Sequence, residues 1–312
     1  MLKPTHRWIF ALVGCLSLLA TACSSDNSAG TGDPATEGER STEAISIGAI
    51  PDQDPDKLQR LYGAVAEYLS SELGVEVNYV PVTDYTAAVS LFKVGDLDMV
   101  WFGGLTGVQA RLQVDGAQAI LQRDIDEEFH SVFIANTASG LTEVQDLEGL
   151  SALKGKRFTF GSEASTSGRL MPQYFLGQAG VEESDFQGQV GFSGSHDKTA
   201  ELVQAGSFDA GVLNEQVWEA RKAAGQVDDS KVIQIFRTPA YHDYHWIARP
   251  DLVERDGGEF VERVKEAFTS LDASDPQQAE ILELFGGEAF IETDNDNYAQ
   301  IEEIGRELGL IQ

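Results

Sequence analysis

Short apolar runs alternate with helical segments along most of the chain, and this alternation constrains the fold more than any other feature. Residues 44–50 and 97–102 have the composition of buried strands. Apolar residues between Leu58 and Leu69 recur at the spacing of a helix, which we expect Gly74 to end. The same alternation starts again near residue 153. Strands that alternate with helices build a parallel-type sheet whose binding loops lie at the carboxyl ends of the strands. The sequence therefore predicts an α/β protein.

The length of 312 residues suffices for two modest α/β lobes. We expect residues 44–137 and 245–312 to form the first lobe and residues 138–244 to form the second. Crossing segments near residues 136–140 and 240–246 would join the lobes. Two lobes connected in this way form a hinged clamp, and ligands bind in the cleft between such lobes.

The N-terminal residues 1–22 have the features of an export signal. A short basic start is followed by apolar residues 8–20, which are too few for a comfortable transmembrane span. This run ends in Leu19-Ala20-Thr21-Ala22-Cys23, which resembles a bacterial lipoprotein signal. We therefore expect lipidation of Cys23 and a flexible tether over residues 23–43. An ordinary secretory signal with an incidental cysteine is the alternative.

Acidic residues outnumber basic ones by 51 to 22, which gives a formal charge of −29. Such a chain repels nucleic acid and anionic lipid, so we expect neither as a partner. Any anion site must overcome this unfavourable field with local donors. The two cysteines, Cys15 and Cys23, both lie near the N-terminus, so the folded body has no disulfide and no thiolate chemistry. We expect no cofactor.

Three consecutive hydroxyl side chains, Ser165, Thr166 and Ser167, form the candidate binding motif. They follow the strand-like residues 157–161 and precede a predicted helix that begins near Pro172. Hydroxyl donors, the free N–H groups of the first helical turn and the helix dipole all favour an anion at such a place. A plain helix N-cap is the alternative, but a cap needs only one such residue.

A set of motifs spread over the chain carries a resemblance to a known family. In chain order these are Gly48-Ala49-Ile50-Pro51, Val82-Thr83-Asp84-Tyr85, Asp98-Met99-Val100-Trp101-Phe102-Gly103, Ser165-Thr166-Ser167-Gly168, Gly194-Ser195-His196 and Phe208-Asp209-Ala210-Gly211. Together they resemble the phosphonate-binding (PhnD-like) proteins of ABC importers, and the similarity runs from about Ile45 to the C-terminus. The resemblance implies a type II periplasmic-binding-protein fold. Related members bind phosphite, hypophosphite or methylphosphonate, and one subgroup is labelled for selenate transport.

The resemblance also implies roles for individual residues. Residues 165–167 would grip the oxygens of the anion, and His196 would donate a further hydrogen bond. Tyr85 and Phe102 would line the pocket from the other lobe, although Phe102 lacks the hydroxyl that a tyrosine would offer there. From the residues alone, His196 could instead be a structural histidine, and Tyr85 a plain core aromatic.

Family members that bind aminoethylphosphonate use two carboxylates for its ammonium group. By counting, these positions fall here on Gln216 and Tyr244, with Glu215 and Asp243 one residue away. The sequence therefore favours a compact oxyanion without an amine. A protonated ligand oxygen would need an acceptor, for which Asp243, Glu215 and neutral His196 are candidates.

Two further patterns suggest other chemistry, and both are weak. His242-Asp243-Tyr244-His245 contains two histidines, but residues three apart in an extended segment face opposite sides, so we expect no metal site. Residues 191–195 approach the nucleophile elbow of hydrolases, but the final glycine is absent. We expect a binding protein and not an enzyme.

The sequence thus predicts an exported, lipid-anchored, monomeric receptor on the outer face of the cell membrane. It would deliver a small tetrahedral oxyanion, of phosphonate, phosphite or selenate type, to an ABC permease with a cytoplasmic ATPase. A sensor that presents the anion to a membrane histidine kinase is the main alternative, and a serine hydrolase is a third.

Ser165→Ala and Thr166→Ala are each expected to weaken anion binding about tenfold or more, because each removes a hydroxyl next to a charged ligand. Isothermal titration calorimetry measures the change. Wild-type affinity in both variants would contradict the site assignment.

Overall fold

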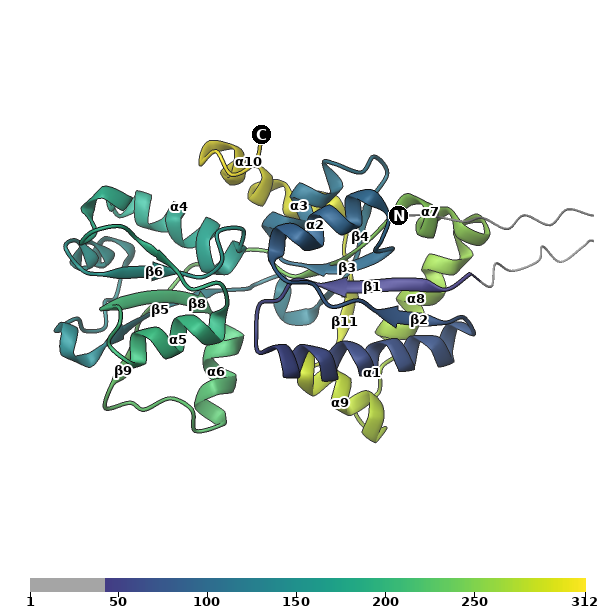
Figure 1. The fold of residues 1–312 in the computed structure, drawn as a ribbon, viewed down its shortest axis with the longest axis horizontal. Coiled ribbons are helices and arrows are strands. Elements are labelled where there is room, and N and C mark those ends of the chain that lie inside the picture. Colours follow the sequence, from purple (N-terminus) through teal and green to yellow (C-terminus); the bar gives the residue numbers. More distant parts are fainter. Residues whose placement is uncertain (1–42) are drawn as a thin grey trace, which may run out of the picture. The chain divides into compact units, whose positions relative to one another are not determined.

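The computed structural model describes residues 43–312 (Figure 1). Residues 1–42 lie outside the described residues, and with them the predicted export signal, Cys23 and nearly all of the predicted tether. Two mixed sheets organise the described part of the chain. We call the six-stranded sheet with the helices packed on it the first lobe, and the five-stranded sheet with its helices the second lobe.

The first sheet has the strand order β11-β4-β10-β3-β1-β2. Its strands are β1 (Ile45–Ala49), β2 (Val77–Tyr79), β3 (Met99–Phe102), β4 (Gln118–Arg123), β10 (His245–Ala248) and β11 (Phe290–Glu292). The strands β2, β1 and β3 are parallel, whereas β10 and β11 run antiparallel to their neighbours. Antiparallel β10 enters the sheet as the chain returns from the second lobe, so the sheet is mixed and not of the parallel type that we predicted.

Helices cover both faces of the first sheet (Figure 1). One face carries α1 (Pro55–Leu73), which contacts both α8 (Glu259–Thr269) and α9 (Pro276–Phe285). The other carries α2 (Tyr85–Val94), α3 (Gly104–Arg111) and α10 (Ala299–Glu307), and the short α7 (Pro250–Glu254) packs on α8. Helix α1 ends at Gly74 in the left-handed conformation, as its sequence predicts.

The second sheet has the strand order β7-β6-β8-β5-β9. Its strands are β5 (Ser131–Asn136), β6 (Phe158–Phe160), β7 (Gly191–Phe192), β8 (Ala210–Asn214) and β9 (Val232–Arg237). Helices α5 (His196–Gln204) and α6 (Glu215–Ala223) contact β5 and β8, and α4 (Met171–Gln178) lies on the opposite face (Figure 1). Short 3₁₀- or π-helical segments occur at 124–126, 137–139, 147–153, 166–170, 183–185, 255–258 and 295–298.

The first crossing between the lobes lies earlier than predicted. Strand β5 pairs antiparallel with β8 and β9, so it belongs to the second sheet, and the chain leaves the first sheet through residues 124–130 instead of 136–140. It returns through residues 238–244, close to the predicted 240–246. Strand β5 is buried along its whole length and could fill either sheet by its composition, so only its long-range pairing decides. The division into two lobes otherwise stays a prediction.

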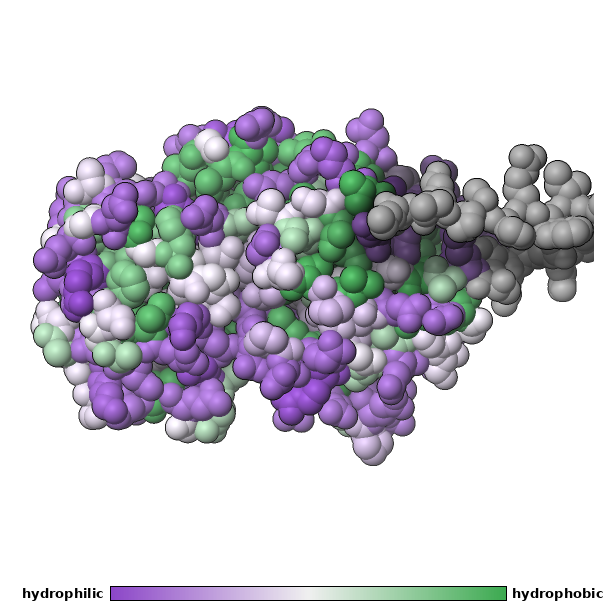
Figure 2. Space-filling view, viewed as in Figure 1, coloured by the Kyte–Doolittle hydropathy of each residue, from purple (hydrophilic) through white to green (hydrophobic). Residues whose placement is uncertain are grey.

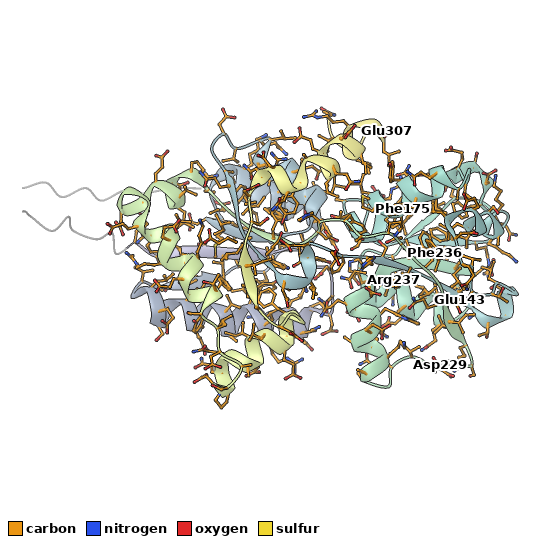
Figure 3. All side chains as sticks on the ribbon, turned by 180° about the vertical axis from the view of Figure 1, so that it is seen from behind. Glu143, Phe175, Asp229, Phe236, Arg237 and Glu307 are labelled. Atoms are coloured by element: carbon orange, nitrogen blue, oxygen red, sulfur yellow. The ribbon has the colours of Figure 1, made fainter. Side chains whose placement is uncertain are left out.

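Aromatic side chains form the centre of the first lobe. Trp101 on β3 lies 5.5 Å from Trp246 and 5.1 Å from Phe285, measured between ring centroids. All three side chains are buried. Aromatic pairs of this kind stabilise a fold by more than the burial of their apolar area alone. Side chains also fill the space between the helices and the sheets in the rest of the described structure (Figure 3). Hydrophilic residues are spread over the visible surface, with hydrophobic residues between them (Figure 2).

Gly107→Ala is expected to lower the free energy of unfolding by about 1–3 kcal/mol. A Cβ at this position in α3 would overlap the ring of His245, which is buried and stacks on Tyr298 at 3.7 Å. Urea denaturation measures the change. The matched control is Gly63→Ala in α1, where no described atom lies within 4 Å of the added Cβ, and it should stabilise the fold by about 0.5–1 kcal/mol. Equal effects of the two changes would contradict the expectation.

Candidate functional site

The predicted ligand-binding residues gather at the junction of the two lobes, and all of them are buried. They are Tyr85, Phe102, Ser165, Thr166, Ser167, His196, Asp243 and Tyr244. Direct bonds across the junction show that it is closed: the N–H of Leu105 in the first lobe donates to Thr166 Oγ1 in the second, at 2.9 Å.

The three hydroxyl residues begin a helix, as predicted, but the first turn is unusually wide. Ser165 is the N-cap, and its Oγ accepts a hydrogen bond from the N–H of Gly168 at 2.9 Å. Residues 166–170 form one π-helical turn before α4 begins at Met171. Such turns are rare and are frequent at functional sites. The cap therefore exists, yet the Ser165 hydroxyl still has its proton to donate.

Gly168 has a steric reason to be glycine. A Cβ there would lie 2.9 Å from Ser165 Oγ and 3.1 Å from the Cα of Gly161. The main chains of Gly161 and Gly168 also share a hydrogen bond of 2.8 Å. This close approach fixes residues 165–167, which we call the hydroxyl run, against the end of β6.

A second helix N-terminus faces the hydroxyl run. At the start of α3, the N–H of Gly104 donates to Asp243 Oδ1 and the N–H of Leu105 to Thr166 Oγ1, both at 2.9 Å. Free N–H groups and the helix dipole favour negative charge at such a terminus. Helix starts from both lobes therefore meet at one buried place.

Three buried polar atoms at this place have no hydrogen-bond partner within residues 43–312. They are Tyr85 Oη, Ser167 Oγ and Asp243 Oδ2. An unsatisfied buried polar atom costs about 1–3 kcal/mol, and folded proteins contain few of them. Two potential donors and one acceptor in one region are therefore the atoms that a small polar ligand would satisfy.

Burial raises the pKa of Asp243 to about 7. The bond from the Gly104 N–H opposes this rise, and the Asp126 carboxylate adds to it. The hydroxyls of Thr166 and Ser167 lie near enough to oppose the rise as well, although Ser167 Oγ makes no hydrogen bond of standard geometry. The carboxyl group of Asp243 can therefore be ionised or protonated near neutral pH, and it can accept or donate a hydrogen bond accordingly.

His196 and Tyr244 bond to the protein itself. The Nδ1 of His196 accepts from the N–H of Asn214 at 3.3 Å, which leaves Nε2 to donate to Tyr244 Oη at 3.2 Å. Burial lowers the pKa of His196 to about 4, so the ring is neutral at physiological pH. Tyr244 Oη in turn donates to Asp52 Oδ2 at 2.8 Å. The ligand-donating role of His196 stays a prediction, because both ring nitrogens have protein partners here.

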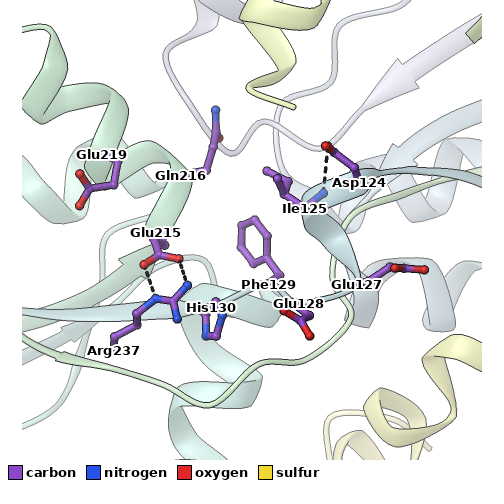
Figure 4. Close-up of a pocket in the computed structure, with 10 residues that line it drawn as sticks. All are labelled: Asp124, Ile125, Glu127, Glu128, Phe129, His130, Glu215, Gln216, Glu219 and Arg237. Carbon is purple, nitrogen blue, oxygen red and sulfur yellow. Dashed lines mark hydrogen bonds and ion pairs between the residues drawn. The ribbon is translucent and has the colours of Figure 1, made fainter. Parts of the chain in front are cut away.

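Phe102 and Glu215 contribute little to the buried site. The ring of Phe102 packs edge-on against Phe92 at 5.7 Å and offers no polar atom. Glu215 forms a two-pronged ion pair with Arg237 (Figure 4). Glu215 belongs with Gln216 to a separate acidic pocket of about 560 Å³. Of the predicted carboxylate acceptors, only Asp243 therefore lies beside the hydroxyl run.

Asp52 and Asn214 were not among the predicted site residues, and they bond to Tyr244 Oη from opposite lobes. For Asp52 a signal existed, since it lies two residues beyond the predicted strand 44–50, where binding loops of α/β sheets occur. Asn214 is the last residue of β8.

Comparison with known proteins identifies the family. Residues 47–298 match the family model of the ABC transporter, phosphonate, periplasmic substrate-binding proteins. The chain belongs to this family. It is 49% identical over 271 residues to a probable ABC transporter phosphite binding protein, PhnD1, of Prochlorococcus marinus, covering 86% of this chain and 91% of the relative. It is 29% identical to the phosphate-import protein PhnD of Mycolicibacterium smegmatis, covering 66% of this chain and 64% of the relative.

The solved structure of Prochlorococcus marinus PhnD1 in complex with methylphosphonate is similar to this phosphonate-family chain throughout. The TM-score is 0.84 at 48% identity, over 87% of this chain and 100% of that one. This similarity confirms the predicted type II periplasmic-binding-protein fold. It also confirms the prediction that the chain is a substrate-binding protein of an ABC transporter and not an enzyme, because the matched relatives are binding proteins.

Two further findings describe the body of this phosphonate-family protein. Within residues 43–312, no cluster of three or more His, Cys, Asp or Glu side chains has the arrangement of a metal site. Over the same residues, no helix combines the length and apolar character that a membrane crossing needs. The predicted lipid anchor at Cys23 lies outside the described residues.

Asp243→Asn is expected to raise the free energy of unfolding at pH 8, measured without ligand, by about 2–4 kcal/mol. The pKa of Asp243 is about 7 in the fold and 3.8 ordinarily, so the folded state binds an extra proton between these values. The ionised carboxyl therefore destabilises the fold above pH 7, and this penalty disappears as the pH falls to about 4. Urea denaturation at pH 4.5 and pH 8 measures it.

The matched control is Asp229→Asn, since Asp229 is exposed on the second lobe (Figure 3). It should change stability little at either pH. A gain from Asp243→Asn that is the same at pH 4.5 and pH 8 would contradict the buried, proton-binding carboxyl.

Proposed function

We propose that the chain is a lipid-anchored receptor that captures a small tetrahedral oxyanion, of phosphonate or phosphite type, between its two lobes. The observation that carries the proposal is the set of unpartnered atoms Tyr85 Oη, Ser167 Oγ and Asp243 Oδ2 beside Ser165 in a closed, buried junction. Two facing helix N-termini add a favourable field for negative charge.

The donors at this place are neutral, and their number suits a tight but reversible complex. Hydrogen bonds to a charged group contribute about 1.5–3 kcal/mol each. The hydroxyls of Tyr85, Ser165 and Ser167, with main-chain N–H groups, would support about micromolar or tighter binding after the cost of association. Two buried guanidinium groups of the described residues lie near the junction, and each is paired with a carboxylate: Arg123 binds both oxygens of Asp126, and Arg169 binds Glu183 at 2.6 Å.

Asp243 supplies the selectivity that we propose. As a carboxylate it would accept a hydrogen bond from a ligand oxygen that keeps a proton. Phosphite and methylphosphonate keep such a proton near neutral pH, whereas sulfate and selenate are fully deprotonated and would be repelled. Selenate therefore ranks below phosphite and methylphosphonate. The relatives support this order, since one is named for phosphite and its solved structure holds methylphosphonate.

The remaining parts of the proposal concern delivery. Family membership implies transfer of the anion to ABC permease subunits driven by an ATPase. Lipidation of Cys23 would hold a monomeric receptor at the outer face of the cell membrane, and residues 23–43 would tether its body. The signal that supports the anchor is the Leu-Ala-Thr-Ala-Cys sequence.

Calorimetric titration with phosphite, methylphosphonate, phosphate, arsenate, sulfate and selenate tests the proposal. We expect phosphite or methylphosphonate to bind most tightly, and Ser167→Ala to weaken that binding about tenfold or more, because its hydroxyl is free to donate. The matched control is Ser193→Ala, since the Ser193 hydroxyl already bonds to Thr199 at 2.7 Å. Its affinity should match the wild type. Binding of none of these anions, or an unchanged affinity in Ser167→Ala, would refute the proposal.

A further inference from the structure

A short loop of the first lobe is fastened to the start of a helix in the second. The main-chain O of Asp52, in the loop between β1 and α1, accepts from the N–H of His196 at 2.9 Å. Two residues on, the N–H of Asp54 donates to Asp197 Oδ2 at 2.9 Å. The other oxygen of Asp197 binds Arg221 of α6 at 2.6 Å, which fixes the carboxylate in place. The contact is thus made by several bonds with good geometry.

The phenol of Tyr244 completes this contact from the return crossing. Its Oη donates to Asp52 Oδ2 at 2.8 Å and accepts from His196 Nε2 at 3.2 Å and from Asn214 Nδ2 at 3.0 Å. A tyrosine hydroxyl has one proton and two lone pairs, so these three bonds use its full capacity. The four side chains are at most 4% exposed. We call Asp52, His196, Asn214 and Tyr244 the latch.

Asp52 is the member of the latch that the first lobe contributes. Its carboxyl is only 4% exposed, and burial raises the pKa of Asp52 to about 6, against the bond from Tyr244. A buried carboxyl without its donor is unfavourable, whereas an exposed one is hydrated at no cost. Separation of the lobes would therefore hydrate Asp52 while it breaks the bond to Tyr244. The bond from Tyr244 therefore offsets part of the cost of burying Asp52 in the closed form.

We infer that Asp52 is a positioning residue for anion binding, which holds the lobes closed through Tyr244 without touching the anion itself. The inference rests on the proposed function, because closure affects affinity only if the anion lies between the lobes. The hydroxyl run belongs to the second lobe, and Tyr85 and α3 belong to the first. An anion held from both sides leaves only when the lobes separate, so the latch sets the rate of dissociation.

Asp52→Ala tests the inference, with methylphosphonate as the probe. We expect its dissociation rate constant, from stopped-flow competition, to rise at least fivefold while the association rate constant changes less than twofold. The matched control is Asp98→Ala, since Asp98 Oδ2 accepts from the N–H of Ser46 at 2.7 Å within the first lobe. Its dissociation rate should stay within twofold of the wild type. A residue with only a structural role would lower stability without this split between the rates.

A second pair of variants covers the case in which Asp52→Ala does not fold. Tyr244→Phe removes the hydroxyl of the latch, and Tyr298→Phe removes a buried hydroxyl that bonds to Gln122 at 2.9 Å inside the first lobe. Only Tyr244→Phe should accelerate dissociation. An equal dissociation rate in Tyr244→Phe and Tyr298→Phe would overturn the latch.

A distance measurement separates failure of the latch from failure of the proposed function. Spin labels on exposed Ser71→Cys and Ser151→Cys report on the two lobes, in the full chain with Cys15 and Cys23 replaced by serine. Without any anion, Asp52→Ala should populate longer label distances than Asp98→Ala. If methylphosphonate does not bind the wild type but these distances differ, the latch stands and the ligand assignment falls. Identical distance distributions in the two variants would overturn the latch whatever binds.

Discussion

The hydrogen bond between the Leu105 N–H and Thr166 Oγ1 joins the two lobes, and the arrangement of the candidate site depends on it. It brings the start of α3 against the hydroxyl run, so that N–H groups and hydroxyls from both lobes lie close together in a buried place. Within residues 43–312, the polar atoms left without partners there belong to both sides of this bond. The site therefore exists as a unit only while the lobes are together.

Net charge and site charge oppose each other in this protein. The chain carries a formal charge of −29, yet it belongs to a family that binds anionic substrates. The nearby Arg123 and Arg169 are paired with Asp126 and Glu183, so these two cationic side chains do little to offset the field. Short-range dipoles remain: hydroxyls, main-chain N–H groups and the ends of two helices. These act over a few ångströms, which suits a ligand that is fully enclosed.

The local features of the fold could be predicted from the sequence, and the long-range ones could not. The strand–helix alternation and the cap at Gly74 come from neighbouring residues, and so does the helix that starts at the hydroxyl run. The placement of β5 depends on pairing with β8 and β9, far along the chain. Likewise, the hydroxyl of Ser167 stays free while His196 is engaged by Asn214 and Tyr244, and only the assembled junction decides this.

Asp243 and Tyr244 are consecutive residues of the return crossing, yet they serve different contacts. The carboxyl of Asp243 meets the start of α3, and the phenol of Tyr244 meets Asp52. Neighbouring side chains in extended backbone point to opposite sides. A single peptide unit therefore links the contact with α3 to the contact that joins the lobes, so a displacement of the return crossing would alter both.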